Sequence, residues 1–216
     1  MSPEFFKAYR LRIKEKQFVE ENLRGNNLKQ GGLLIRNIED DCRGPRCGTL
    51  GGIVYQTDDD EKKYALTCHH LFPEKNSPVY MKDSRRIKKI GKCIFTTKEY
   101  TDFAAIRINK KFSHRCDATF RRKDKKKTKV SVYRDCIYPI CTVYKNGIAS
   151  KITSGKVEYS EFYLNNLNRG GTKEISFLVR NKGKEFAKNG DSGSLVFFEP
   201  DKIDQNYVHL IGMVCS

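Results

Sequence analysis

Short apolar stretches, separated by polar or glycine-containing turns, recur along most of the chain. They occupy positions 33–38, 47–55, 64–67, 78–81, 87–95, 103–108, 130–133, 141–147, 153–157, 175–179, 195–198 and 208–215. Several alternate apolar and polar residues, as a strand with one buried face does. Short strands with turn signals every ~8–12 residues are typical of a β-barrel or sandwich. The pattern therefore predicts an all-β protein.

The N-terminal segment follows a different pattern. Ser2, Pro3 and Glu4 are typical of a helix start: a capping serine, a proline at the first helical position and an acid in the first turn. Apolar residues partly in helical period follow among many charges, and Gly25 ends this pattern. We expect an N-terminal helix and a lead-in segment over residues 1–44.

The chain is strongly basic, and much of its positive charge is local. The 216 residues include 42 basic and 26 acidic ones, which gives a net charge of +16. Such a charge favours acidic partners or nucleic acid. The densest run, at 121–129, has no interleaved aromatic residue to stack on bases. We therefore interpret residues 119–129 as a solvated basic linker, and nucleic acid is a possible partner that the pattern does not favour.

The cysteines and the apolar runs indicate the cellular compartment in which the protein is expected. No apolar run approaches the ~18 residues of a membrane span, and the first residues do not form a signal peptide. The chain has eight cysteines but no Cys-x-x-Cys pair. We expect reduced thiols in an intracellular protein, cytoplasmic or nuclear, with no membrane partner. We expect no metal site and no cofactor, because zinc ligands usually come at close spacing.

The strongest candidate for chemistry is the loop at 190–194, Gly-Asp-Ser-Gly-Ser, which runs directly into the apolar stretch 195–198. Its glycines permit a tight turn that a Cβ would forbid. The turn presents Ser192, and the backbone N–H groups of Gly190 and Ser192 are placed to stabilise an oxyanion. A serine alone is a poor nucleophile and needs a base oriented by an acid.

The chain supplies candidates for both groups. His69 and His70 lie in the apolar run 66–72, and Asp102 opens the strand 103–108. A histidine in such a run is commonly a hydrogen-bonded core residue, and an aspartate at a strand start can simply cap a turn. Taken with Ser192, however, they give the order His, Asp, Ser, which one class of serine hydrolases uses.

These motifs together resemble the trypsin-like (chymotrypsin-fold) serine peptidases, over roughly Cys47 to Ser216. The resemblance rests on Thr67-x-x-His70, on Asp-Phe-Ala-Ala-Ile from Asp102 and on the loop around Ser192. It implies two antiparallel six-stranded β-barrels, at 45–118 and 130–216, with the linker between them. It also implies that His70, not His69, is the base, that Asp102 orients it and that Ser192 attacks.

The family pattern also locates a substrate pocket. It places Phe186 at the pocket base, six residues before the nucleophile, and Cys215 on the strand that lines the substrate cleft. Phe186 carries no carboxylate, so we expect an apolar residue before the scissile bond rather than Arg or Lys. The usual bridge cysteines are replaced by Leu71 and Lys188, which agrees with free thiols.

The family pattern includes a partner for the aspartate that matches Asp191, and the sequence does not reveal that partner here. In zymogen-activated relatives the residue matching Asp191 pairs with a freed N-terminal amine. No cleavage site of that kind precedes Cys47. The chain therefore resembles members without a zymogen-type N-terminus, and the partner of Asp191 is left open.

The sequence is compatible with two functions. The first is a serine endopeptidase that hydrolyses protein or peptide substrates through an acyl-enzyme. The second is a non-catalytic module of peptidase fold that binds acidic protein or nucleic acid through its basic surface. The complete set of His70, Asp102 and Ser192 favours the first. Nothing in the pattern predicts an oligomeric state.

Overall fold

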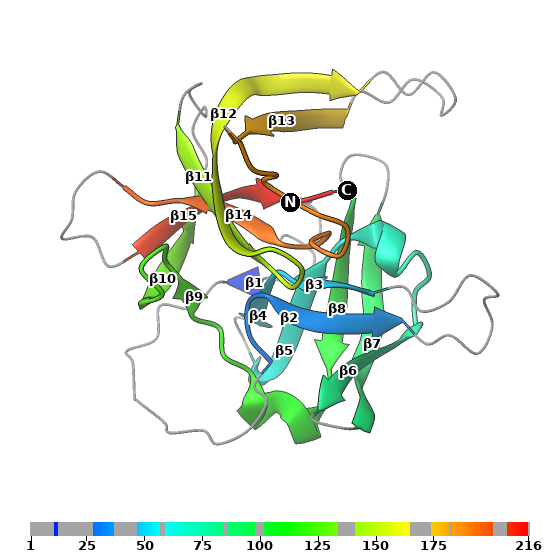
Figure 1. Ribbon diagram of the computed structural model, residues 1–216. Coiled ribbons are helices and arrows are strands. Elements are labelled where there is room, and N and C mark those ends of the chain that lie inside the picture. The colour runs from blue at the N-terminus through cyan, green and yellow to red at the C-terminus, as the bar shows by residue number, and fades with distance from the viewer. Residues whose placement is uncertain are drawn as a thin grey trace.

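The computed structural model describes residues 11–12, 28–36, 47–56, 59–83, 86–97, 102–133, 141–164, 174–181, 183–200 and 207–215. These residues form two β-sheets, one in the lower half of Figure 1 and one in the upper half. The helical turns of the described residues are two short 3₁₀ segments, η1 (His69–Leu71) and η2 (Lys110–Arg115). None of the helices in these ranges is long and apolar enough to cross a membrane. The prediction of an all-β protein is confirmed.

The first sheet has eight strands, paired antiparallel throughout, in the order β1-β4-β5-β8-β7-β6-β2-β3. Their bounds are β1 (Leu11–Arg12), β2 (Gly32–Arg36), β3 (Cys47–Leu50), β4 (Gly52–Gln56), β5 (Asp59–Thr67), β6 (Pro78–Asp83), β7 (Arg86–Thr97) and β8 (Phe103–Ile108). The inward residues form an apolar core that includes Leu34, Ile53 and Ile106. Because β2 belongs to this sheet, the first barrel begins before residue 45, where the sequence places its start.

The second sheet has seven strands in the order β13-β12-β11-β14-β15-β10-β9. Their bounds are β9 (Phe120–Arg121), β10 (Lys127–Val132), β11 (Thr142–Gly147), β12 (Lys151–Leu164), β13 (Glu174–Arg180), β14 (Leu195–Phe198) and β15 (Tyr207–Met213). Its pairs are antiparallel except β10 with β15, which run parallel. β10 and β15 are joined through β11, β12, β13 and β14, and parallel neighbours need a long connection of this kind. The two predicted β-domains are thus present, with more than six strands in each sheet and one parallel pair.

The basic segment at 119–129 is structured and joins the second sheet. It contains β9 and the start of β10, which pair as a hairpin with Lys127 opposite Arg121. Thr128 and Val130 are buried, while the lysines between and before them point outward. Its charge predicts a linker, but its alternating buried positions make it a hairpin.

The predicted N-terminal helix differs from the structure where the two can be compared. Most of residues 1–27 lie outside the described residues. Leu11 and Arg12 form β1, which pairs with Gln56 and Tyr55 of β4. At these two residues the helix prediction is wrong, because pairing with the edge of β4 overrides the weak helical period.

A shared apolar core joins the two sheets. Its first-sheet members come from β4, β5 and β8, and its second-sheet members come from β9, β10, β14 and β15. Phe120 and Phe197 meet edge-to-face within it, with ring centroids 6.2 Å apart. This packing fixes the ends of β5 and β8 relative to the loop before β14. Those are the segments that carry His70, Asp102 and Ser192.

Candidate active site

His70 lies on η1, directly after β5, and contacts Asp102 at the start of β8. β5 and β8 are antiparallel neighbours with Thr67 opposite Ala104, which brings the end of one strand to the start of the other. Buried Leu71 and Phe72 anchor η1 in the first-sheet core. The histidine ring is therefore left beside the carboxylate, with 39% of its side chain exposed.

Asp102 accepts two hydrogen bonds from the same histidine. Its Oδ2 accepts from Nδ1 of the His70 ring, and its Oδ1 accepts from the His70 backbone N–H at 2.9 Å. Burial alone would raise the pKa of Asp102, but the hydrogen bonds from His70 lower it below its ordinary value. An ionised carboxylate can only accept, so Nδ1 must carry its proton. The other ring nitrogen, Nε2, is then a free base in neutral His70.

The neighbouring His69 makes a different contact. Its Nδ1 lies 2.7 Å from Oγ1 of Thr96 on β7. Consecutive residues of η1 thus direct their rings to different strands. Of the two histidines that the apolar run offers, it is His70 that meets Asp102.

The loop around Ser192 packs against two first-sheet residues, Thr49 of β3 and Thr67 at the end of β5, shortly before His70. The backbone N–H of Thr49 on β3 donates to the Ser192 carbonyl at 2.8 Å. Gly193 has φ +93°, and a Cβ there would lie 2.3 Å from the Thr67 hydroxyl. A glycine is therefore required by both backbone conformation and close approach. Ser192 itself is buried, with 4% of its surface exposed.

Gly190 is also in the left-handed region, with φ +99°. Its carbonyl accepts a hydrogen bond from the Thr49 hydroxyl at 2.8 Å. No described residue accepts a hydrogen bond from the Gly190 N–H. The Gly190 carbonyl is thus held by Thr49 of the first sheet.

Asp191, between these residues, is fully buried and is surrounded by five donors. Its Oδ1 accepts from the backbone N–H groups of Ala149 and Ser150, at 3.0 and 3.1 Å. Its Oδ2 accepts from Lys145 Nζ at 2.8 Å, the Ser150 hydroxyl at 2.5 Å and the Lys188 N–H at 3.0 Å. The carboxylate is therefore satisfied at both oxygens.

The cation in this cluster is Lys145 of β11, and it is as buried as its partner. Both side chains of the pair are 0% exposed. Lys145 also donates to the Ser150 hydroxyl and lies over the Phe186 ring, 6.0 Å from its centroid. Burial alone would raise the pKa of Asp191, but Lys145, Ser150 and the Lys188 N–H lower it to about 2. Asp191 is consequently ionised, and Lys145 is the internal partner that the sequence left open.

Sequence reasoning missed Lys145, although the pattern contains a signal. Val143, Lys145 and Gly147 occupy the alternate, inward positions of β11, so a lysine stands where an apolar residue is expected. Lysines are almost never fully buried unless they are paired. A lysine at an inward strand position therefore predicts a buried carboxylate partner.

Thr49 connects the two halves of the site and was also missed. It is 0% exposed. Its hydroxyl donates to the Gly190 carbonyl and accepts from the Ile148 N–H at 3.0 Å, while its carbonyl accepts from the Thr67 hydroxyl at 2.9 Å. One first-sheet residue thus links the strand before His70 to the loop around Ser192.

The two predicted pocket residues have different surroundings. Phe186 is half-buried and packs with Val214 and other apolar residues of the second sheet. The Thr153 hydroxyl donates to its carbonyl at 2.6 Å. Cys215 is exposed and follows β15, close to Cys68 and Asp102. The structure thus brings Cys215 to the His70–Asp102 pair and leaves Phe186 in the packing of the second sheet.

No protein-family model and no curated protein matches the chain. Solved structures do match it along most of its length. A glutamic-acid-specific serine protease that uses a histidine triad in substrate binding is 15% identical, with a TM-score of 0.60 over 88% of this chain and 85% of that one. The Nocardiopsis protease is 13% identical, with a TM-score of 0.54 over 79% and 78% of the two chains. Thermobifida fusca protease A is 13% identical, with a TM-score of 0.52 over 78% and 76%. At these identities the likeness establishes the chymotrypsin-like two-barrel fold.

Proposed function

We propose that this chain is a serine endopeptidase that cleaves protein or peptide substrates. The observation that carries the proposal is the double hydrogen bond from His70 to the ionised Asp102 carboxylate. It fixes the ring and leaves Nε2 as a base, which is the arrangement that activates a serine. The glycine-containing loop around Ser192 and the chymotrypsin-like fold support the same function.

In this mechanism the Ser192 hydroxyl attacks the carbonyl carbon of the scissile peptide bond. His70 Nε2 takes the hydroxyl proton as the new C–O bond forms, and Asp102 stabilises the imidazolium. His70 then gives that proton to the leaving amine, and an acyl-enzyme on Ser192 remains. A water molecule, deprotonated by His70, hydrolyses the ester and restores the serine.

The backbone N–H groups of Gly190 and Ser192 hold the negative oxygen of the tetrahedral intermediate. Their direction depends on the peptide turn that Asp191 anchors. The five donors around that carboxylate preorganise the turn, and preorganised donors need no rearrangement when charge develops. The Lys145–Asp191 pair thus supports the oxyanion site without touching substrate.

Within the proposal, Phe186 and Cys215 belong to the substrate pocket. An aromatic wall at Phe186 favours an apolar residue before the scissile bond, because it cannot neutralise a buried guanidinium. An acidic residue at that position is no better served, since the nearby Lys145 ammonium is already held by Asp191. We therefore expect specificity unlike that of the glutamic-acid-specific neighbour.

A peptide library digested by the full chain tests both parts of this proposal. We expect cleavage after apolar residues, and no cleavage by the Ser192→Ala variant. Dominant cleavage after Arg, Lys or Glu would refute the pocket assignment alone. Cleavage that persists in Ser192→Ala would refute the mechanism.

An intracellular, reducing location is part of the same proposal. The six cysteines in the described part of the chain are all free thiols. Thiol counting under denaturing, non-reducing conditions is expected to find all or nearly all of the eight. Three or four disulfides would contradict the proposed compartment.

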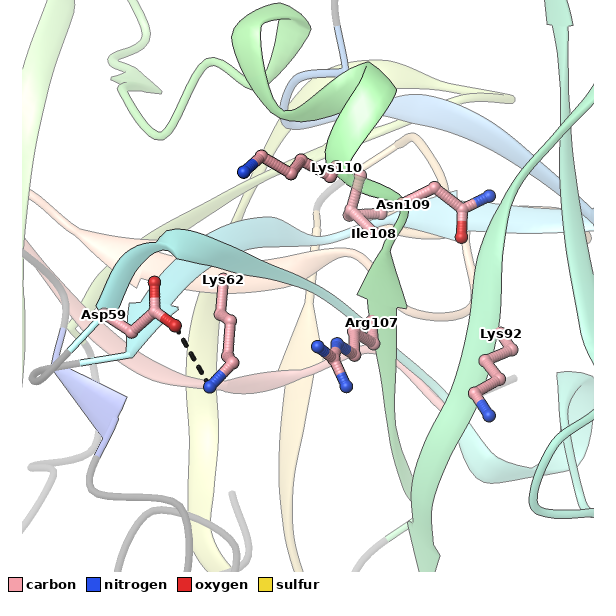
Figure 2. Close-up of a pocket in the computed structure, with 7 residues that line it drawn as sticks. All are labelled: Asp59, Lys62, Lys92, Arg107, Ile108, Asn109 and Lys110. Carbon is pink, nitrogen blue, oxygen red and sulfur yellow. Dashed lines mark ion pairs between the residues drawn. The ribbon is translucent and has the colours of Figure 1, made fainter.

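A basic cavity favours a second function that does not depend on hydrolysis: binding of a polyanion. The cavity has a volume of about 330 Å³. Figure 2 shows its lining residues, which are Asp59, Lys62, Lys92, Arg107, Ile108, Asn109 and Lys110. Its one carboxylate, Asp59, already pairs with Lys62 at 3.0 Å. The remaining lining charges are all positive.

The sheet register places these cations close together. Lys92 of β7 is directly opposite Arg107 of β8, and like charges in that position repel. A bound anion would relieve the repulsion. The cavity lies at the far end of β5 and β8 from the His70–Asp102 pair. Arg107 is five positions after Asp102, which is roughly 17 Å at the usual rise per residue.

A DNA oligonucleotide is a suitable probe, because its phosphates present repeated negative charge without a demand for base stacking. We expect the Lys92→Gln/Arg107→Gln double variant to bind it more weakly and with a shallower salt dependence, by about two released counterions. Lys156→Gln, an exposed lysine of β12, is the matched control. Equal binding by the double variant and the control would refute this second function.

A further inference from the structure

Two thiols lie behind the His70–Asp102 pair. Cys68 is fully buried between β5 and η1, and Cys215 is exposed after β15. Their sulfur atoms are 4.0 Å apart. The two sulfur atoms and a carboxylate oxygen of Asp102 all lie within 4.8 Å of one another. Residues far apart in the sequence thus form one cluster of three potential metal ligands.

The geometry suits a metal ion better than a disulfide. Two thiolates bound to a tetrahedral zinc ion, each about 2.3 Å from it, are about 3.8 Å apart. The observed sulfur separation is close to that value. A disulfide needs a sulfur separation of about 2.05 Å, so the two side chains would have to approach by nearly half of their present distance.

We propose that Cys68, Cys215 and Asp102 form a binding site for a soft divalent cation such as Zn²⁺, and that occupancy of this site inhibits the proposed peptidase. Thiolates are the protein ligands that select soft metals, and a carboxylate completes a three-ligand set with a fourth position open to water. The exposed Cys215 provides the path by which the ion reaches the buried Cys68.

Binding requires the loss of a proton from each thiol. The hydrogen bond with Cys215, burial and the nearby Asp102 carboxylate raise the pKa of Cys68 well above its ordinary value. Without metal, Cys68 is therefore a neutral thiol. One Zn²⁺ then displaces two protons and leaves the cluster with a charge of −1, counting two thiolates and one carboxylate.

Metal binding would act on catalysis through Asp102. This carboxylate orients His70 and stabilises the imidazolium, and its oxygens already accept two hydrogen bonds. A cation coordinated by the same carboxylate competes with His70 for its oxygens, so it weakens the hydrogen bonds that orient the imidazole ring. The inhibitory part of the inference rests on the proposed function, whereas the binding part does not.

Cadmium alone is the probe for binding, because its thiolate complexes absorb in the ultraviolet. The experiment uses the full chain with a phosphine reductant present, which prevents disulfide formation. We expect one Cd²⁺ per chain with a thiolate band. Cys68→Ala should lose about half of the band and bind roughly a hundredfold more weakly, since a three-ligand site loses one strong ligand.

Cys93→Ala is the matched control. Cys93 is also a fully buried thiol. Its hydrogen-bond acceptors are the carbonyls of Phe72 and Phe95, which are not part of the cluster. The control should keep the band and the affinity. If Cys68→Ala does not fold, Cys215→Ser at the exposed position answers the same question, with an expected loss of about half of the band. Equal binding by either cluster variant and the control would overturn the site.

Inhibition is measured separately, with Zn²⁺ and the peptide that the library identifies. We expect hydrolysis to fall with added Zn²⁺ and to return on chelation, and Cys93→Ala to respond as the unmodified chain does. Cadmium binding without inhibition of an active enzyme would overturn the regulatory part. An inactive chain that still binds Cd²⁺ through Cys68 would refute the proposed peptidase and leave the metal site standing.

Discussion

Asp102 and Asp191 are two ionised carboxylates at the same site with opposite environments. Asp102 belongs to the first sheet, is 20% exposed and accepts hydrogen bonds from one residue, His70. Asp191 precedes β14 of the second sheet, is fully buried and accepts from five donors, including the buried ammonium of Lys145.

The difference matches two distinct tasks. His70 must gain and lose a proton in each catalytic cycle, so its partner carboxylate stays near solvent and makes few other contacts. The turn around Ser192 must not move, so its carboxylate is saturated with hydrogen bonds. We therefore expect changes at Asp102 to affect turnover, and changes around Asp191 to affect stability as well as turnover.

The largest expected effect is that of Asp102→Asn. An amide facing Nδ1 donates instead of accepting, so the His70 proton moves to Nε2 and the base is lost. By analogy with the trypsin triad, kcat should fall about 10⁴-fold. The melting temperature should change little, because the asparagine can still accept from the His70 backbone N–H. A large loss of stability with turnover retained would reverse the roles that we assign to the two carboxylates.

Among the changes around Asp191, Lys145→Met should destabilise the folded chain most. It leaves the Asp191 charge buried without its cation, which typically costs about 3–5 kcal/mol. For a chain of this size the melting temperature should fall by roughly 10 °C. Differential scanning calorimetry measures this change.

Lys156→Met is the control for that experiment. Lys156 is an exposed lysine on the neighbouring strand β12. Its loss should change the free energy of unfolding by no more than about 0.5 kcal/mol. Adding Asp191→Asn to Lys145→Met should recover part of the lost stability, because it removes the unpaired charge. Equal stability of Lys145→Met and Lys156→Met would show that the ion pair does not hold the loop.

Acid should lower the stability of the folded chain by protonating Asp191, within a defined range of pH. Asp191 has a pKa of about 2 in the folded chain, against 3.8 in an exposed peptide. A lowered carboxyl pKa stabilises the folded state fully above about pH 4, and this contribution is lost as the pH falls toward 2. It amounts to about 2 kcal/mol. Chemical unfolding at a series of pH values should show the loss, and Asp191→Asn should flatten that part of the curve.

The smallest expected effect comes from Thr49→Val, which cuts the link between the first sheet and the Ser192 loop. Valine keeps the shape but leaves the Gly190 carbonyl and the Ile148 N–H without their partner. We expect a loss of about 1–2 kcal/mol in the free energy of unfolding, measured with urea. Thr49→Ser retains the hydroxyl and should lose less. The reverse order of the two variants would mean that the methyl group, not the hydrogen bonds, matters at this position.

Much of the fold follows from local pattern. Short alternating strands and turn glycines predict an all-β chain, and most predicted strands lie within a few residues of the observed ones. The hairpin at 120–132 was missed because its lysines conceal the buried alternation of Phe120, Thr128 and Val130. β1 was missed because pairing with β4 decides the structure there, and no local signal reports that pairing.

The site divides in the same way. His70, Asp102 and Ser192 can be chosen from motifs, because each motif is local. The partner of Asp191 cannot be found in that way, since Lys145 lies 46 positions away and its contact depends on how β11 packs under the loop. The pair of Cys68 and Cys215, 147 positions apart, is likewise a product of tertiary structure. Spacing rules for metal ligands do not detect such a cluster.

The central claim is that Ser192 is an activated nucleophile, and a fluorophosphonate probe tests it most directly. The probe phosphonylates only a serine whose proton a neighbouring base removes, and fluoride is the leaving group. Intact mass analysis of the full chain should show one adduct, located on Ser192 by peptide mapping and absent from Ser192→Ala and His70→Ala. A folded chain that forms no adduct, or one that is labelled equally in Ser192→Ala, would contradict the account.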